Sequence, residues 1–514
     1  MSSSLAESVG QLIIGKVPGT ELDDGSKDCL KKGTISGVTI FKENVQSQEQ
    51  LLNLCDSVRR FSYHPSYIMV DQEGGAVQRL DDVISPLPSM MAMGKLNDPE
   101  RLKLIIAVSG KQLSLLGINC VLAPVLDVNT NPANPIIGTR ALGEDVEKVA
   151  ELGAVIIRSY LEAGVLPVAK HFPGHGDTDL DSHLALPKLS FDLERLERVE
   201  LSPFRENLLL TPAILVAHLW IECLDKELLP ASLSARVSTQ LLKEEMGFQR
   251  LLVSDDMLMK AITSNWGLEE ACVRAVAAGL DLLLVCSGPN DARSVHAAIV
   301  KAVESGRISE DRLASAVRAR KAALNILPPH EEVEKGRRLA ALAKSVAASE
   351  QLLLETSSAA IELSRGVPRS IFAEDGKIDI FIPQHPRYSL KYREELCAAV
   401  PELEGRLSEH RYPLNPSADE LPGLLSDCGD RVVFVSFRAP INRGQLGLAE
   451  KLKAVSKKNL LIAADIPYDL DRIPDWDNAV AVCDPSDLAV RAFARLMKKQ
   501  LAALREPRCS CHHD

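Results

Sequence analysis

The sequence lacks an apolar run long enough to cross a membrane. A transmembrane helix needs roughly 18 consecutive apolar residues, and no stretch of the 514 residues approaches that length. The first eight residues also lack the basic start and apolar stretch of a secretory signal. We therefore predict a cytoplasmic protein with no membrane partner.

Positive charge is also scarce. The chain has 59 Lys and Arg against 70 Asp and Glu, a formal net charge of -11. This balance argues against a nucleic-acid partner, because phosphate binding needs clustered Lys and Arg. The 11 cysteines are an odd number and mostly isolated in apolar runs, which is typical of reduced, buried thiols. In the tail, Cys509–Asp514, we predict only incidental metal affinity, because a terminus offers no rigid geometry.

Apolar segments of strand length alternate with amphipathic stretches such as Asp98–Leu116 and Val146–Ala163. This alternation predicts a parallel sheet, and eight strands favour an α/β fold of the (β/α)8 TIM-like barrel type. A doubly wound sheet is the alternative. The predicted strands are Gln11–Lys16, Gly37–Phe41, Tyr67–Asp71, Ile118–Val128, Val165–Lys170, Ala213–His218, Arg250–Asp255 and Leu280–Cys286.

The rest of the chain predicts a second, smaller domain. We expect the barrel over residues 1–330, a helical linker over 331–350, a C-terminal α/β sandwich domain over 351–505 and a tail over 506–514. Because the sandwich domain carries no comparable cluster of reactive residues, we expect a packing or scaffolding role for it. Its strand candidates are Ile378–Ile382, Arg431–Phe437, Asn459–Ala464 and Ala479–Val482.

The most informative segment runs from Lys170 to His183. In 14 residues it contains three histidines, three aspartates, a lysine and two glycines. Burying so many titratable groups unpaired would be costly, so this density indicates a functional loop rather than core. Asp71, His218 and Asp255 end other predicted strands. In a barrel those carboxyl ends converge on one mouth, which predicts an active site there.

Five motifs follow one another along the predicted barrel. They are Val70–Gly75 with Gln78–Leu80, Ala123–Val128, Asn134–Arg140, the Lys170–His183 loop and Ser254–Met257. Together they resemble the β-N-acetylglucosaminidases of glycoside hydrolase family 3, over about residues 5–325. The resemblance implies a retaining exo-hydrolase that removes terminal β-linked N-acetylglucosamine from peptidoglycan-derived fragments. It implies no cofactor and no metal.

The resemblance also implies roles for individual residues. Asp255 matches the family nucleophile, which would form a covalent glycosyl-enzyme. His183 matches the acid/base, with Asp181 as its partner. An imidazole titrates near neutrality, and a nearby carboxylate favours the imidazolium needed as the acid.

Sugar recognition falls, by the same resemblance, on a group that combines cations with one carboxylate. A pyranose presents hydroxyls that both donate and accept, which suits such a lining. For His175 and Asp177 we favour a structural role, whereas His218 could be either a buried, satisfied histidine or a substrate contact. The predicted sugar-binding residues are Asp71, Arg79, Arg140, Lys170 and His171.

Other functions stay open at this point. A phosphorylase of the same family is the nearest alternative, because an imidazole does not repel phosphate as a second carboxylate would. A metal-dependent hydrolase using His171, His175, Asp181 and His183 is less favoured, since Lys170 beside them opposes a cation. A sugar-binding protein without activity would be expected to lack one of the reactive groups. The expected partner is a small carbohydrate, and the sequence gives no oligomeric state.

Overall fold

The computed structural model describes residues 4–179, 186–329 and 333–505, which form two compact units. The first unit takes the described residues up to Leu87 and from Asn97 to Glu350. The second takes Pro88–Leu96 and the described residues from Gln351 onward. Among the described helices, none has the length and apolar character needed to span a bilayer.

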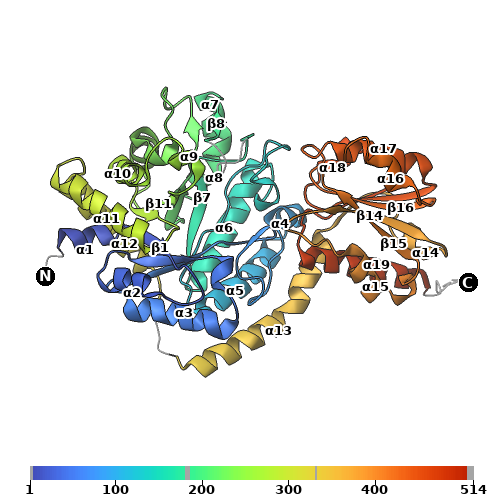
Figure 1. Ribbon diagram of the computed structural model, residues 1–514, viewed down its shortest axis with the longest axis horizontal. Helices are drawn as coiled ribbons and strands as arrows, with labels where there is room; N and C mark the ends of the chain where they lie inside the picture. The colour runs from blue at the N-terminus through green and yellow to red at the C-terminus, as the bar shows by residue number, and fades with distance from the viewer. Residues whose placement is uncertain (1–3, 180–185, 330–332, 506–514) are drawn as a thin grey trace, which may run out of the picture. The chain divides into compact units, whose positions relative to one another are not determined.

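The first unit is a closed barrel of eight parallel strands, with helices around it (Figure 1). Each of the eight predicted segments overlaps one of these strands, although β7 and β11 extend two and one residues beyond their predicted ends. The predicted barrel is confirmed, and the doubly wound alternative is wrong for this unit. In spatial order the strands are β1 (Ile13–Lys16), β12 (Leu282–Leu284), β11 (Leu251–Asp256), β9 (Ala213–Val216), β7 (Leu166–Phe172), β6 (Cys120–Val121), β3 (Tyr67–Val70) and β2 (Gly37–Ile40).

The helices of the barrel begin and end where local sequence signals place them. In α5 (Pro99–Leu116), Asp98 caps the first turn by accepting from the Arg101 amide, and Gly117 ends the helix in the left-handed region. In α6 (Val146–Glu162), Asp145 caps the first turn in the same way. The other helices are α1 (Leu5–Gly10), α2 (Asp24–Lys31), α3 (Gln48–Phe61), α7 (Leu193–Arg195), α8 (Ser202–Glu206), η5 (Arg236–Glu245), α9 (Lys260–Thr263), α10 (Leu268–Ala278), α11 (Pro289–Glu304) and α12 (Glu310–Leu324), with the short turns η1 (Lys42–Asn44), η3 (Leu196–Glu200) and η4 (Ala231–Leu233).

The barrel strands are apolar because they are covered on both sides. All seven residues of β7 are buried, and side chains such as Tyr67, Met69 and Val168 fill the interior. A parallel barrel directs every strand's carboxyl end to the same mouth. Polar side chains at those ends therefore become neighbours although they are far apart in sequence.

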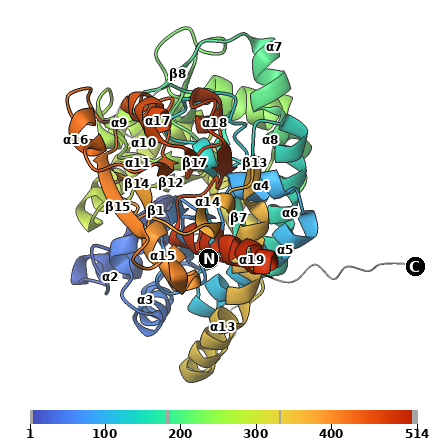
Figure 2. The ribbon, with the colours of Figure 1, turned by 90° about the vertical axis from the view of Figure 1, so that its right-hand side faces the viewer.

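The second unit contains a six-stranded mixed sheet with helices on both faces (Figure 2). In β14 (Ile378–Gln384) the alternating Ile378, Ile380 and Ile382 pack with α15 (Tyr392–Ala399) and α19 (Asp487–Arg505), whereas Phe381 packs with α17 (Gly444–Val455). The predicted α/β sandwich is confirmed. The sheet order is β13 (Glu362–Arg365), β18 (Asn478–Ala481), β17 (Lys458–Ala463), β16 (Arg431–Ser436), β14 (Ile378–Gln384) and β15 (Leu407–Pro413), with only β13 antiparallel among these six; the remaining helices are α14 (Ser370–Ala373), α16 (Leu421–Leu425) and α18 (Asp469–Arg472).

One early segment belongs to the second unit rather than to the barrel. In α4 (Met90–Leu96), Met91 and Ala92 pack into the core on the α17 face of the second sheet. The Ser89 amide donates to Asp484 Oδ2 at 2.8 Å. The second unit is therefore discontinuous in sequence. At the other crossing point, α13 (Lys335–Ala360) runs without interruption from the first unit's residues into the second's.

Candidate active site

The turn after β3 brings Asp71 and Arg79 together at the barrel mouth. A short hairpin of β4 (Gln72–Gly74) and β5 (Val77–Gln78) reverses the chain, and its turn glycines, at φ 117° and 53°, adopt angles that other residues avoid. The Arg79 amide consequently donates to the Asp71 carbonyl at 3.2 Å. Arg79 Nη2 lies 3.7 Å from Asp71 Oδ2.

Lys170 is buried between two carboxylates. Its Nζ lies 2.7 Å from Asp71 Oδ1 and 2.5 Å from Glu73 Oε1, and only 3% of its side chain is exposed. Burial alone would lower the pKa of Lys170, but the two carboxylates outweigh burial and raise it. Lys170 is therefore held as an ammonium ion.

Glu73 also binds Arg140, which ends the η2 turn (Gly138–Arg140). Arg140 donates to Glu73 through Nε at 2.8 Å and Nη2 at 2.9 Å. Burial opposes the charge on Glu73, yet Arg140 and Lys170 hold its pKa well below the usual range. Our sequence analysis quoted Glu73 within a motif but assigned it no role; its place two residues beyond a strand-end aspartate was the available signal.

The His171 ring is fixed in one tautomer. Arg140 Nη2 lies 3.0 Å from His171 Nε2, and an arginine can only donate, so Nε2 accepts. The proton is then on Nδ1, which donates to Asp127 Oδ2 at 2.7 Å. Asp127 is fully buried, and its Oδ1 accepts from the amides of His171 and His175. Asp127 is the second residue that the sequence analysis left without a role.

Asp255 and Asp256 end β11 and have different environments. Asp255 Oδ1 accepts from the Asp256 amide at 2.8 Å. Burial would raise the pKa of Asp255, but that pKa is lowered overall, and the Asp256 amide and the Lys170 ammonium are two of the causes. By contrast, Asp256 Oδ1 accepts from the backbone of Leu258 and Cys286, and burial raises its pKa to about 6.

His218 is buried and hydrogen-bonded at both ring nitrogens. Its Nε2 donates to the Asp256 carbonyl at 3.0 Å, so its Nδ1 accepts from Ser232 Oγ at 2.7 Å. These bonds match the structural alternative for His218. They fix the backbone immediately after Asp255.

The start of the histidine-rich loop is anchored to the loop that precedes Arg140. Asn134 Nδ2 donates to the carbonyls of His175 and Gly176 at 2.9 and 3.0 Å. Gly176 is required by close packing, since a Cβ there would lie 1.7 Å from the Val128 carbonyl oxygen. Asp181 and His183 lie outside the described residues.

The potential of the site for metal binding is limited by these bonds. Both ring nitrogens of His171 are already engaged, so this ring has no lone pair for a metal. Within the described ranges, no three His, Cys, Asp or Glu side chains are grouped so that they could hold a metal ion.

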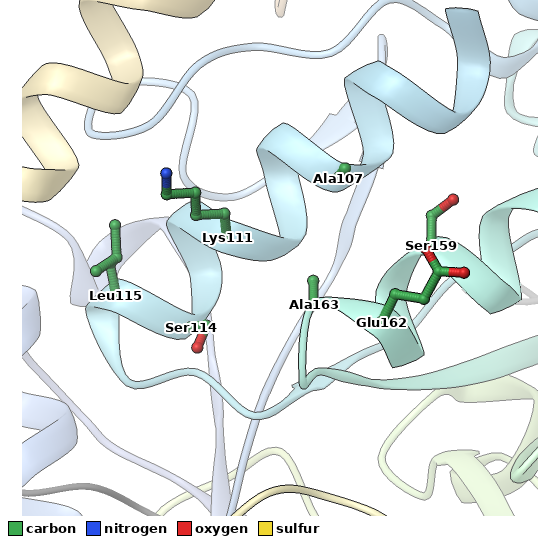
Figure 3. Close-up of a pocket in the computed structure, with 7 residues that line it drawn as sticks. All are labelled: Ala107, Lys111, Ser114, Leu115, Ser159, Glu162 and Ala163. Carbon is green, nitrogen blue, oxygen red and sulfur yellow. The ribbon is translucent and has the colours of Figure 1, made fainter. Parts of the chain in front are cut away.

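A surface groove of about 410 Å³ lies elsewhere, between α5 and α6 (Figure 3). Its lining is mostly small residues, with Lys111 and Glu162 as the charged side chains. Both helices lead into the amino ends of the following strands, β6 and β7. The groove contains none of the residues described above, so we do not assign the reaction to it.

Comparison with known proteins identifies the family. Residues 4–320 match the family model described as the Glycosyl hydrolase family 3 N terminal domain. The chain therefore belongs to glycosyl hydrolase family 3, and the resemblance seen in the sequence is confirmed.

Curated relatives and a solved structure agree with this placement. Beta-hexosaminidase A of Pseudoalteromonas piscicida is 31% identical over 326 residues, covering 58% of this chain but only 54% of the relative. Beta-hexosaminidase of Idiomarina loihiensis is 33% identical over 300 residues, covering 58% of this chain and 89% of that protein. A family 3 β-N-acetylglucosaminidase structure from Paenibacillus sp. str. FPU-7 is 31% identical, has a TM-score of 0.85 and covers 97% of each chain.

Proposed function

We propose that this chain is a retaining exo-β-N-acetylglucosaminidase. Asp255 is the nucleophile, His183 the acid/base assisted by Asp181, and the substrates are peptidoglycan-derived fragments that end in β-linked N-acetylglucosamine. The family match and the hexosaminidase relatives support the reaction class. The observation that carries the proposal is the position of the Asp255 carboxyl at the end of β11, at the same barrel mouth as the buried cation of Lys170.

The environment of Asp255 suits a nucleophile. A carboxylate must be ionised to attack the anomeric carbon, and the neighbours of Asp255 lower its pKa. Among the described residues only Oδ1 of Asp255 accepts a hydrogen bond, from the Asp256 amide. Oδ2 is then the oxygen that bonds to carbon as the aglycone leaves.

Asp71 and Arg79 offer complementary groups for sugar hydroxyls. Asp71 Oδ1 is occupied by Lys170, but its Oδ2 is 3.7 Å from Arg79, too far for a hydrogen bond. The Arg79 side chain is 36% exposed, so its Nη2 is accessible to a ligand beside Asp71. A hydroxyl donates and accepts, so one hydroxyl, or a neighbouring pair, satisfies both groups.

His183 would protonate the leaving oxygen in the first step and take a proton from water in the second. With Asp255 as the nucleophile, the two displacements return the anomeric carbon to its original configuration. His183 lies in a segment whose flanking residues are held on both sides. Before it, Asn134 binds the His175 carbonyl, and after it β8 (Lys188–Leu189) pairs with β10 (Trp220–Ile221).

A cytoplasmic location would favour small, soluble fragments as substrates over intact cell wall.

The test is incubation with N-acetylglucosaminyl-β-1,4-anhydro-N-acetylmuramic acid, with and without inorganic phosphate, followed by mass analysis. We expect free N-acetylglucosamine under both conditions, released first as the β-anomer. A sugar 1-phosphate as the main product would establish the phosphorylase alternative instead. No cleavage of this disaccharide or of an aryl β-N-acetylglucosaminide would refute the proposed activity.

A further inference from the structure

We infer that Glu73 is a positioning residue for the sugar-binding site. Its carboxylate holds Lys170 and Arg140 in place. Loss of its charge therefore reduces the affinity for substrate more than it reduces the free energy of unfolding. The inference rests on the proposed function, because Lys170 and Arg140 are residues that we assign to sugar recognition.

The contacts of Glu73 leave it no direct access to a ligand. Oε1 accepts from Lys170 Nζ at 2.5 Å and from Arg140 Nη2 at 2.9 Å, while Oε2 accepts from Arg140 Nε at 2.8 Å. The Glu73 side chain is only 1% exposed. Any effect of Glu73 on the substrate must therefore act through the two cations.

Lys170 depends on this carboxylate for its charge. Its ammonium group is buried, which opposes ionisation, and the positive Arg140 opposes it further. Asp71 and Glu73 face it from the turn after β3 and favour ionisation. The more distant Asp255 also interacts with it from β11. Without the charge of Glu73, Asp71 is the main remaining counter-ion, so the pKa of Lys170 falls and the ammonium moves toward Asp71.

Arg140 transmits the same change to His171. Its Nη2 bridges Glu73 and the His171 ring, so a shift of the guanidinium alters the hydrogen bond that keeps Nε2 as an acceptor. One carboxylate thus sets the geometry of a lysine from β7 and of an arginine from η2. Among the described carboxylates, only Glu73 bonds to both Lys170 and Arg140, so it fixes their positions relative to each other.

The barrel provides a matched control at its opposite end. Asp281 precedes β12, is fully buried, and bridges Lys243 at 3.2 Å and Arg312 at 2.5 Å. It has the same chemistry as Glu73, a buried carboxylate between a lysine and an arginine. Because it lies at the amino end of the strands, it is remote from the sugar-binding mouth.

The experiment compares Glu73→Gln with Asp281→Asn in the full chain, using an aryl β-N-acetylglucosaminide across pH and urea unfolding. For Glu73→Gln we expect KM to rise about tenfold or more with a smaller change in kcat, because the two sugar-binding cations lose the carboxylate that positions them. The alkaline limb of N-acetylglucosamine affinity, measured by titration calorimetry, should move to lower pH, because Lys170 loses its charge there. Affinity is the readout because the alkaline limb of kcat/KM also reports deprotonation of His183. Asp281→Asn should lower the unfolding midpoint and leave KM and the alkaline limb unchanged.

Unchanged KM and an unchanged alkaline limb in a folded Glu73→Gln variant would overturn the inference. If Glu73→Gln does not fold, Glu73→Asp decides: a raised KM with the wild-type alkaline limb supports the inference, and a wild-type KM overturns it. A wild-type chain that cleaves no N-acetylglucosaminide refutes the proposed function instead, so the two failures are distinguishable.

Discussion

Replacing Asp127 by Asn reverses the hydrogen-bond polarity around His171. Asp127 Oδ1 accepts from two backbone amides, and the Asn oxygen can keep both bonds. Its NH2 group then replaces Oδ2 and presents a donor to His171 Nδ1. The ring must shift its proton to Nε2, where Arg140 Nη2 already donates from 3.0 Å. Two donors then face each other.

The magnitude follows from the bond that is lost. A hydrogen bond to a charged group contributes about 1.5–3 kcal/mol, and each 1.4 kcal/mol is roughly a factor of ten. If Asp127→Asn disturbs the sugar-binding geometry by that amount, kcat/KM falls about 10- to 100-fold. The unfolding free energy should fall by a similar amount, because Asp127 is fully buried.

The assay combines kinetics with a direct view of the ring. Steady-state rates on an aryl β-N-acetylglucosaminide give kcat/KM, and 15N NMR of histidine-labelled protein reports which nitrogen of His171 carries the proton. Asp281→Asn serves again as the buried-carboxylate control. If Asp127→Asn keeps wild-type kcat/KM while the proton stays on Nδ1, the argument that Asp127 sets the tautomer is wrong.

Three other substitutions test separate parts of the site. Asp255→Asn should reduce kcat by about a thousandfold or more while titration calorimetry still detects N-acetylglucosamine binding; near-normal turnover would remove Asp255 as the nucleophile. Asp256→Asn keeps an oxygen for both backbone donors. The raised folded-state pKa of about 6 means that the wild type loses stability as pH rises from 3.8 through 6. The variant should therefore be about 2–3 kcal/mol more stable at pH 7 and show no advantage near pH 3.5, as measured by urea unfolding at both pH values. Gly176→Ala should destabilise the fold by about 1–3 kcal/mol through contact with the Val128 carbonyl, and an unchanged melting temperature would contradict that packing.

The barrel could be predicted from sequence because each strand carries a short, largely apolar segment. The two strands missed in the second unit, β13 and β15, are the edges of its sheet. Their sequences are largely polar, Glu-Leu-Ser-Arg and Leu-Ser-Glu-His-Arg-Tyr-Pro, as edge strands tend to be. Apolar patterning therefore does not distinguish them from loops.

The placement of candidate residues at the barrel mouth was predictable where a residue lies at or next to the carboxyl end of a strand, as with Asp71, Lys170 and Asp255. Glu73 and Asp127 lie near predicted strand ends, but this position alone does not indicate their importance, which arises from partners distant in sequence. Glu73 precedes two glycines and looks like part of a turn, and only the folded barrel brings Arg140 to it. No local pattern could assign Pro88–Leu96 to the second unit either, because its partners lie near the other end of the chain.

The interruption of the barrel sequence by α4 constrains how the polypeptide acquires its structure during synthesis. Ser89 leaves the ribosome early, but its partners at Cys483 and Asp484 are 394 and 395 residues away along the chain. Until those residues emerge, Met91 and Ala92 have no sheet to cover them. The core of the second sheet is therefore completed by Pro88–Leu96, a segment that is translated together with the first barrel strands. A shortened polypeptide ending at Glu350 would leave the apolar side chains of this segment exposed.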